Sequence, residues 1–147
     1  MIELIFVIVV IGILSAVAIP KLAASRDDAV LVKGKSQVAA IRSGIAMQKS
    51  KRLLEGITPF IPTILDSVTT YNTSNQRLFN YADGNGSNVL EYPIYSKVNH
   101  DGFWVKSAAK QYKLYLSNTS VQFDYNSTTG VFDCSDHTEE NCKSLTE

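Results

Sequence analysis

The chain has 147 residues with 14 basic and 14 acidic side chains, so its formal net charge at pH 7 is zero. This balance argues against a strongly basic nucleic-acid-binding surface, and the length leaves room for one head domain of about 90 residues beside a helical stalk. Every aromatic residue except Phe6 lies after residue 58. That distribution indicates a β-rich core in the second part of the chain.

Residues 1–20, MIELIFVIVVIGILSAVAIP, form a nearly uninterrupted apolar segment. From Leu4 to Ile19 only one glycine and one serine break the apolar run. A helix of this length would be about 28 Å long, close to the hydrocarbon thickness of a bilayer. A cleaved signal peptide would begin with basic residues, whereas the first basic residue here is Lys21. The segment therefore predicts a helix that is retained in the membrane.

Glu3 is the only charged residue of this segment. A carboxylate costs about 2.5–3.5 kcal/mol at the centre of a bilayer and less near the interface, so such a residue is a candidate functional residue. The motif MIEL, the apolar run containing Gly12, and AVAIPKL with Pro20 resemble the type IV filament superfamily. That superfamily comprises type IV pilins and the pseudopilins of type II secretion. Its members carry a basic leader and two further residues before MIEL, the first becoming N-methylated, so the first mature residue stays open here.

The resemblance implies that Glu3, Gly12 and Pro20 act in assembly. In a filament built from stacked helices, the Glu3 carboxylate would pair with the N-terminal amine of the adjacent subunit. Glycine and proline both disfavour a helix interior, which leaves two outcomes for the stretch between Gly12 and Pro20. It loosens in the filament core, as in related filaments, or Pro20 only kinks the helix. In a bilayer we expect the helix to hold, because its backbone hydrogen bonds have no substitute there.

Residues 21–56 predict an amphipathic continuation of the helix, which Gly56 ends. Apolar residues recur on one stripe with a period of 3.6: Leu31, Val38, Ile41, Ile45 and Leu53. Basic residues are expected on the other faces: Lys33, Lys35, Arg42, Lys49, Lys51 and Arg52. Asp27 and Asp28 are expected in solvent, with pairing to a basic residue of a neighbouring subunit as the alternative. The apolar stripe should pack against the sheet of the head.

Residues 57–147 are predicted to form the globular head. Residues 57–102, where the family carries its variable loop, are rich in turn residues, and only a short helix after Pro62 is expected there. From residue 103 onward, β-branched and aromatic residues predict an antiparallel meander with strands at 103–107, 112–116, 121–125 and 131–134. The fold class is therefore α+β, with a long N-terminal helical stalk packed on a small antiparallel sheet, as the resemblance to pilins also implies.

Cys134 and Cys142 are the two cysteines of the chain. In an exported, membrane-anchored chain a disulfide is favoured over free thiols, and in the chain-entropy model it would contribute roughly 2.5 kcal/mol. The pair resembles the C-terminal disulfide loop of type IV pilins, which engages partners and which major pseudopilins commonly lack. Asp136 and His137 lie inside the loop, but the spacing is not that of a zinc site, so no metal is expected.

Asp83, Asn85 and Ser87 match the opening of a calcium loop. The loop has no acid at its twelfth position, so a plain turn is the favoured interpretation, although major pseudopilins bind calcium in their heads. Asn85 and Asn126 each have an acid two residues before and a Ser or Thr two residues after. This fits the extended bacterial N-glycan sequon, but turns are built from the same residues, so a chance match is the alternative.

Residues typical of enzyme active sites are sparse. The two histidines, His100 and His137, lie in polar loops. The sequence has no glycine-rich phosphate loop, no metal-ligand set and no nucleophile elbow. We therefore expect neither an enzymatic activity nor a cofactor, apart from the weak calcium candidate.

The favoured interpretation is a structural subunit of a type IV pilus-like filament. It would lie in the bacterial inner membrane before assembly and in an extracellular or periplasmic filament afterwards. The resemblance implies a homo-oligomer, with prepilin peptidase and an inner-membrane assembly platform as partners. Two alternatives stay open: the major pseudopilin of a type II secretion system, and a membrane-tethered periplasmic binding module that does not polymerise. The sequence does not indicate whether the filament would serve motility, adhesion, DNA uptake or secretion.

Overall fold

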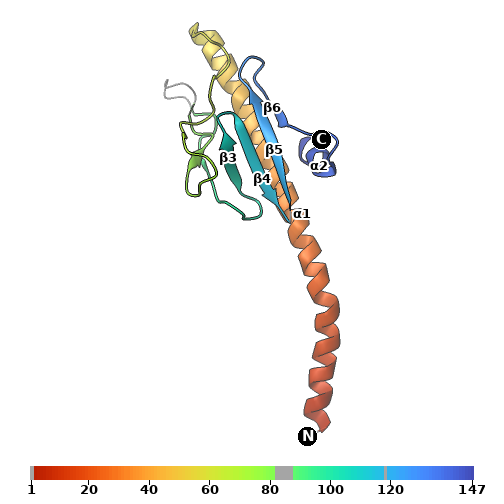
Figure 1. Ribbon diagram of the computed structural model, residues 1–147. Coiled ribbons are helices and arrows are strands. Elements are labelled where there is room, and N and C mark those ends of the chain that lie inside the picture. The colour runs from red at the N-terminus through yellow and green to blue at the C-terminus, as the bar shows by residue number, and fades with distance from the viewer. Residues whose placement is uncertain (1, 82–87, 118) are drawn as a thin grey trace.

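The structure is a computed structural model that describes residues 2–81, 88–117 and 119–147. One end of a very long helix lies against a small sheet, and the other end projects far beyond the head (Figure 1). The elements in chain order are α1 (Ile2–Glu55), β1 (Arg77–Leu78), β2 (Ile94–Tyr95), β3 (Trp104–Ala108), β4 (Gln111–Leu116), β5 (Thr119–Asn126), β6 (Val131–Cys134) and α2 (Glu140–Thr146). The predicted α+β class is confirmed.

α1 is a single helix of 54 residues, about 80 Å long. It runs through Gly12 and Pro20 without interruption, as expected for the chain in a bilayer. Loosening of this stretch inside a filament stays a prediction. The helix ends where the sequence predicts, because Gly56 has a φ of 67°, in the left-handed region that favours glycine.

One face of the second half of α1 is buried against the sheet. The apolar stripe supplies Val38, Ile41 and Ile45, all at most 3% exposed, and Leu31 in part. The prediction for Leu53 is wrong, since its side chain is 56% exposed. The 3.6-residue period places Gln48 and Arg52 in line with Ile45 instead, and both are buried. Arg52 was expected on an exposed face and lies in the buried one.

The main sheet has the order β3-β4-β5-β6 with every neighbour antiparallel, and α1 covers one of its faces (Figure 1). The predicted strands agree with the observed ones to within two residues. Five aromatic rings, with nearest centroids 4.6–5.9 Å apart, form the centre of the core: Phe79, Trp104, Tyr112, Phe123 and Phe132. The head therefore has a core of its own, closed by the inner face of α1.

The irregular segment between α1 and β3 covers one edge of this sheet. The backbone N–H groups of Asn72 and Lys97 donate to the carbonyls of Lys106 and Trp104 on β3, at 2.8 and 3.2 Å. The short helix expected after Pro62 is not formed: residues 57–76 contain no helix. The Pro62 carbonyl instead accepts a 2.5 Å hydrogen bond from the Tyr125 hydroxyl on β5, so this stretch is bound to the sheet in an extended form.

The sequence analysis did not predict α2. This seven-residue helix packs against α1 through Leu145, which is 1% exposed. A Cβ atom on Gly34 of α1 would lie 2.9 Å from Cδ2 of Leu145. The missing side chain at Gly34 therefore allows α2 to lie directly on the long helix.

Candidate functional site

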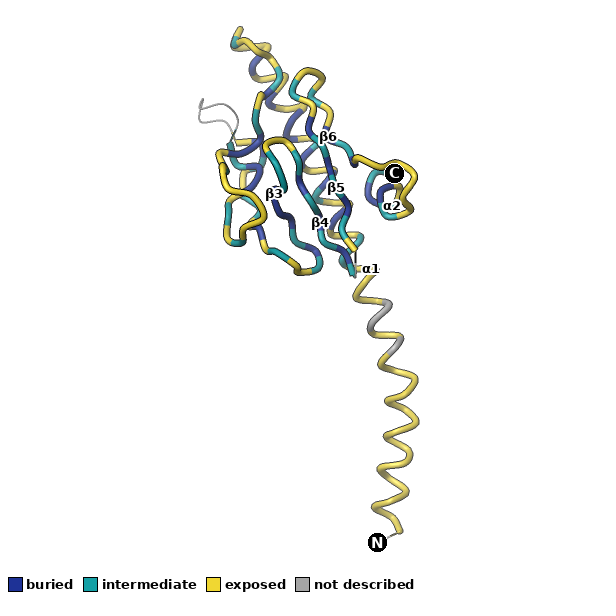
Figure 2. Tube along the Cα trace, in the orientation of Figure 1, coloured by how far each residue is buried: buried dark blue, intermediate teal, exposed yellow. Residues whose placement is uncertain are grey.

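The N-terminal third of α1 is uncovered. Ile2–Ile19, 18 residues, is long and apolar enough to cross a membrane, and none of it is buried within the chain. Exposed fractions of its large side chains run from 38% at Val10 to 82% at Ile2, and Figure 2 shows α1 in the exposed colour from the N-terminal end almost to the head. Soluble monomers rarely expose a contiguous apolar surface of more than a few hundred Å². This segment therefore requires lipid or protein around it.

Glu3 lies in the first turn of this uncovered helix. Its side chain is exposed, and no ion pair joins it to another of the residues that the structure describes. A carboxylate in the first turn interacts favourably with the helix dipole, but only by about 0.3–1 kcal/mol. That is less than the cost of placing a charge in an apolar medium. A cation from outside the chain is thus the partner that Glu3 lacks.

Gly12 and Pro20 have no visible role within a single chain. No atom lies within 4 Å of the position that a Cβ on Gly12 would take, so the fold of one subunit does not require glycine there. Pro20 is an interior residue of α1, where it has no N–H to donate to the preceding turn. Their predicted roles in assembly stay predictions.

A band of charged residues lies where α1 enters the head. The Arg26 guanidinium is 3.5 Å from the Asp101 carboxylate, and the Ser117 hydroxyl donates to the Asp27 carboxylate. Asp27 and Asp28 are both exposed, as expected. Exposed pairs of this kind contribute little stability, so the band mainly marks the boundary between the apolar segment and the head.

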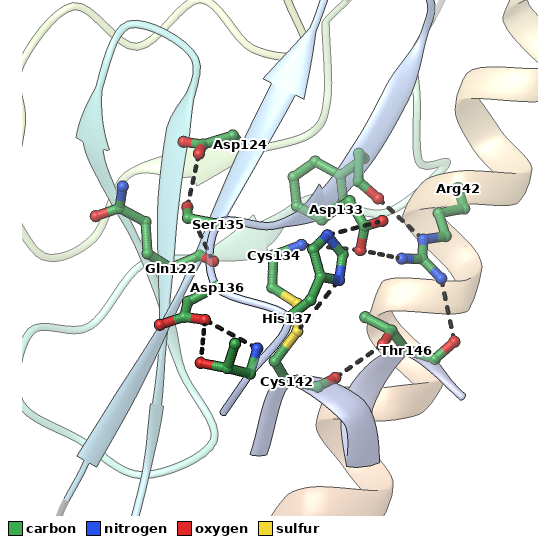
Figure 3. Close-up of a disulfide and its surroundings, with 12 residues drawn as sticks. Arg42, Gln122, Asp124, Asp133, Cys134, Ser135, Asp136, His137, Cys142 and Thr146 are labelled. Carbon is green, nitrogen blue, oxygen red and sulfur yellow. Dashed lines mark hydrogen bonds and ion pairs between the residues drawn. A yellow bond between two sulfur atoms is a disulfide. The ribbon is translucent and has the colours of Figure 1, made fainter. Parts of the chain in front are cut away.

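The predicted disulfide between Cys134 and Cys142 is confirmed and joins the end of β6 to α2 (Figure 3). Arg42 reaches this region from α1. Its Nη2 lies 2.8 Å from Asp133 Oδ1, and its Nε and Nη1 donate to the carbonyls of Phe132 and Thr146 at 2.9 and 3.4 Å. One half-buried guanidinium thus binds both chain segments that the disulfide connects, a role that the helical periodicity did not reveal.

The loop closed by the disulfide is polar and exposed. The Thr138 hydroxyl and then its backbone N–H donate to the Asp136 carboxylate and lower its pKa. His137 Nε2 lies 3.8 Å from Asp133 Oδ2, and His137 Nδ1 lies 3.8 Å from Cys142 Sγ. Because both sulfurs are bonded to one another, they offer no thiolate to a metal ion.

A buried polar cluster in the head was missed by the sequence analysis. The Lys106 ammonium donates to Asp66 Oδ1 at 2.6 Å and to the Val68 carbonyl at 2.7 Å. The Tyr112 hydroxyl donates to the other Asp66 oxygen at 2.6 Å. Burial, and then the Asp66 charge, raise the pKa of Tyr112 well above its usual value. The signal was Lys106 itself, two residues after the inward-facing Trp104 and so on the same face of β3.

The remaining candidates lie in turns. Asp83, Asn85 and Ser87 lie outside the described residues. Asn126 ends β5 and is exposed, and its side-chain oxygen accepts hydrogen bonds from the backbone N–H groups of Thr128 and Thr129 at 2.9 and 3.3 Å. The Asn126 side chain is accessible, and its glycosylation stays a prediction.

Comparison with protein-family models gives no match for this chain, and no curated protein or solved structure matches it either. The architecture itself, an N-terminal apolar helix packed on a small antiparallel sheet with a disulfide, is compatible with a pilin-like fold.

Proposed function

We propose that this chain is the structural subunit of a type IV pilus-like filament, assembled by stacking of its N-terminal helices. One observation carries the proposal: an entirely exposed 18-residue apolar helix whose single charge is Glu3, attached to a head with a closed core. Lipid covers an apolar helix well enough for anchoring. It gives no reason for a carboxylate in the apolar segment, because lipid tails supply no cation.

In this proposal the segment moves between two apolar environments. It first lies in the inner membrane and later packs among the same segments of neighbouring subunits. In the filament the Glu3 carboxylate pairs with the N-terminal amine of the adjacent subunit, as the resemblance to pilins implies. A charge buried without a partner is strongly destabilising. Subunits added out of register would leave Glu3 unpaired, so the ion pair selects the correct axial position.

The test compares membrane levels and filament yield of Glu3 variants in the native organism. Glu3→Ala and the isosteric Glu3→Gln should leave the amount of membrane-bound subunit unchanged and reduce sheared filaments at least tenfold. Val9→Ala is the matched control, because it trims an exposed apolar side chain of the same helix without touching the charge. It should assemble normally. Normal filament yield from Glu3→Ala would contradict the proposal.

The same experiment separates the alternatives. A membrane-tethered binding module that does not polymerise tolerates loss of Glu3 and stays in the membrane fraction in every variant. A type II pseudopilin depends on Glu3 as a pilin does, but in cells it forms short periplasmic filaments. Filament length therefore distinguishes the pilus subunit from the pseudopilin.

A further inference from the structure

Beyond the apolar segment, α1 carries a second uncovered apolar face on the side away from the sheet. Its large side chains are Leu22, Val32, Met47 and Leu54, which are 71%, 66%, 66% and 88% exposed. Helix faces that remain in water normally carry charged and polar residues. An apolar face alongside a folded head indicates that something covers it.

This face is continuous and uncharged. With about 100° of rotation per residue, its positions fall within about 40° of one line along α1: Leu22, Ser25, Ala29, Val32, Ser36, Ala40, Ser43, Met47, Ser50 and Leu54. All of them are exposed, and none is charged. Charged side chains flank the line on both sides, among them Lys33 and Lys51 on one and Asp28 and Lys35 on the other. We call this line the outer face.

We infer that the outer face receives the apolar segment Ile2–Ile19 of a second copy of this chain, an inference that rests on the proposed filament. The chain itself contains both surfaces, and neither is covered within one copy. The outer face is about 48 Å long and the apolar segment about 27 Å, so the segment fits on it entirely. Docking there would remove apolar surface from water without desolvating a charge on the outer face.

The side chains between the large residues also suit a helix partner. Serine and alanine allow two helix backbones to approach closely. A buried serine hydroxyl needs an acceptor, and Ser50 already donates to the Ala46 carbonyl of its own helix at 3.1 Å. Lipid is a poor alternative, because the outer face continues along the head to Leu54 near the end of α1 farthest from the apolar segment.

This contact joins two different surfaces of the same chain. Such a heterologous interface leaves the second surface of each copy free for the next copy, so it closes into a ring or continues as an open helical filament. A symmetric dimer would not satisfy it. The geometry of one subunit therefore already favours an extended polymer.

Thiol labelling tests the inference on the full-length chain. The native cysteines are bonded to one another, so Ser43→Cys places a single free thiol at the middle of the outer face. In filaments we expect a maleimide probe to react with it at least tenfold more slowly than in detergent-solubilised subunits. Lys49→Cys is the matched control, exposed on the same helix but about 140° away from the outer face, and it should react equally in both states.

A second pair of variants gives an independent readout. Ser43→Lys should abolish filaments while membrane levels and unfolding of the head, followed by Trp104 fluorescence, stay unchanged. Ser43→Ala should assemble normally. Filaments in which Ser43→Cys remains fully reactive, or normal filaments from Ser43→Lys, would overturn this inference and leave the proposed function intact. Protection of Ser43→Cys in membranes before assembly would also overturn it, because another membrane component would then cover the face.

Discussion

Lys106 and Asp66 show how a single residue fixes the least regular part of this head. Both side chains are at most 4% exposed, and their carboxylate and ammonium groups are joined by hydrogen bonds to each other, to Tyr112 and to the Val68 backbone. The sequence predicts the strand that contains Lys106. It does not predict the acid, because Asp66 lies 40 residues earlier in a segment without periodicity.

Replacing Lys106 by Met should destabilise the head by about 3–5 kcal/mol, because Asp66 would be left as a buried charge without a cation. Urea unfolding of the full chain in detergent measures this, since Trp104 is the only tryptophan and is fully buried. The double variant Lys106→Met/Asp66→Leu is the control and should recover part of the loss. A single variant as stable as wild type would show that the pair contributes nothing.

Tyr112 predicts a loss of stability at alkaline pH. Because burial and Asp66 raise the pKa of Tyr112 in the folded chain, the unfolded chain releases this proton at lower pH than the folded one. Stability is thus fully present below about pH 10, the pKa of an unperturbed tyrosine, and falls as the pH rises above it. Trp104 fluorescence should report alkaline unfolding, with a weaker pH dependence in Tyr112→Phe. An identical pH profile in that variant would refute the assignment.

At the scale of elements, local pattern decided what could be predicted. The four strands follow from alternation within a few residues, and the buried stripe of α1 from its 3.6-residue period. Leu53 misled the prediction because residue type outweighed phase there, while α2 has only Cys142 and Leu145 as buried residues. Of the candidate site, Glu3 and the disulfide could be predicted from the sequence, whereas the three contacts of Arg42 depend on how distant segments meet.

Gly44 is required by the contact between α1 and the irregular segment. A Cβ there would lie 2.1 Å from the Val89 carbonyl oxygen, closer than any real contact. Gly44→Ala should therefore destabilise the head by about 1–3 kcal/mol through overpacking, measured by the same urea unfolding. Gly12→Ala is the matched control, since no atom lies within 4 Å of its Cβ position. It should leave head stability unchanged, and equal stability of both variants would contradict the packing account.

The disulfide should hold α2 and the end of β6 together on α1. Replacing Cys134 and Cys142 by serine should cost roughly 2.5 kcal/mol in the chain-entropy model. It should also increase hydrogen exchange of the α2 amides, which Arg42 alone would then hold in place. Alkylation of the native wild-type protein gives the control, with no reactive thiol expected. Two alkylated cysteines there would rule out the bond.

At the scale of the whole molecule, one helix serves two environments. Its second half closes the core of the head with one face, while its first third and the outer face remain uncovered. A monomer in water would aggregate through these surfaces. A subunit that is anchored in a membrane and then polymerises covers both of them.

The most direct test of the filament proposal is electron microscopy of material sheared from the surface of native cells, with mass spectrometry of the same fraction. We predict thin filaments in which this chain is the main component and carries the Cys134–Cys142 cross-link. If cells that express the chain yield no such filaments, and the chain is recovered only from the membrane fraction, then it anchors a head and does not build a polymer.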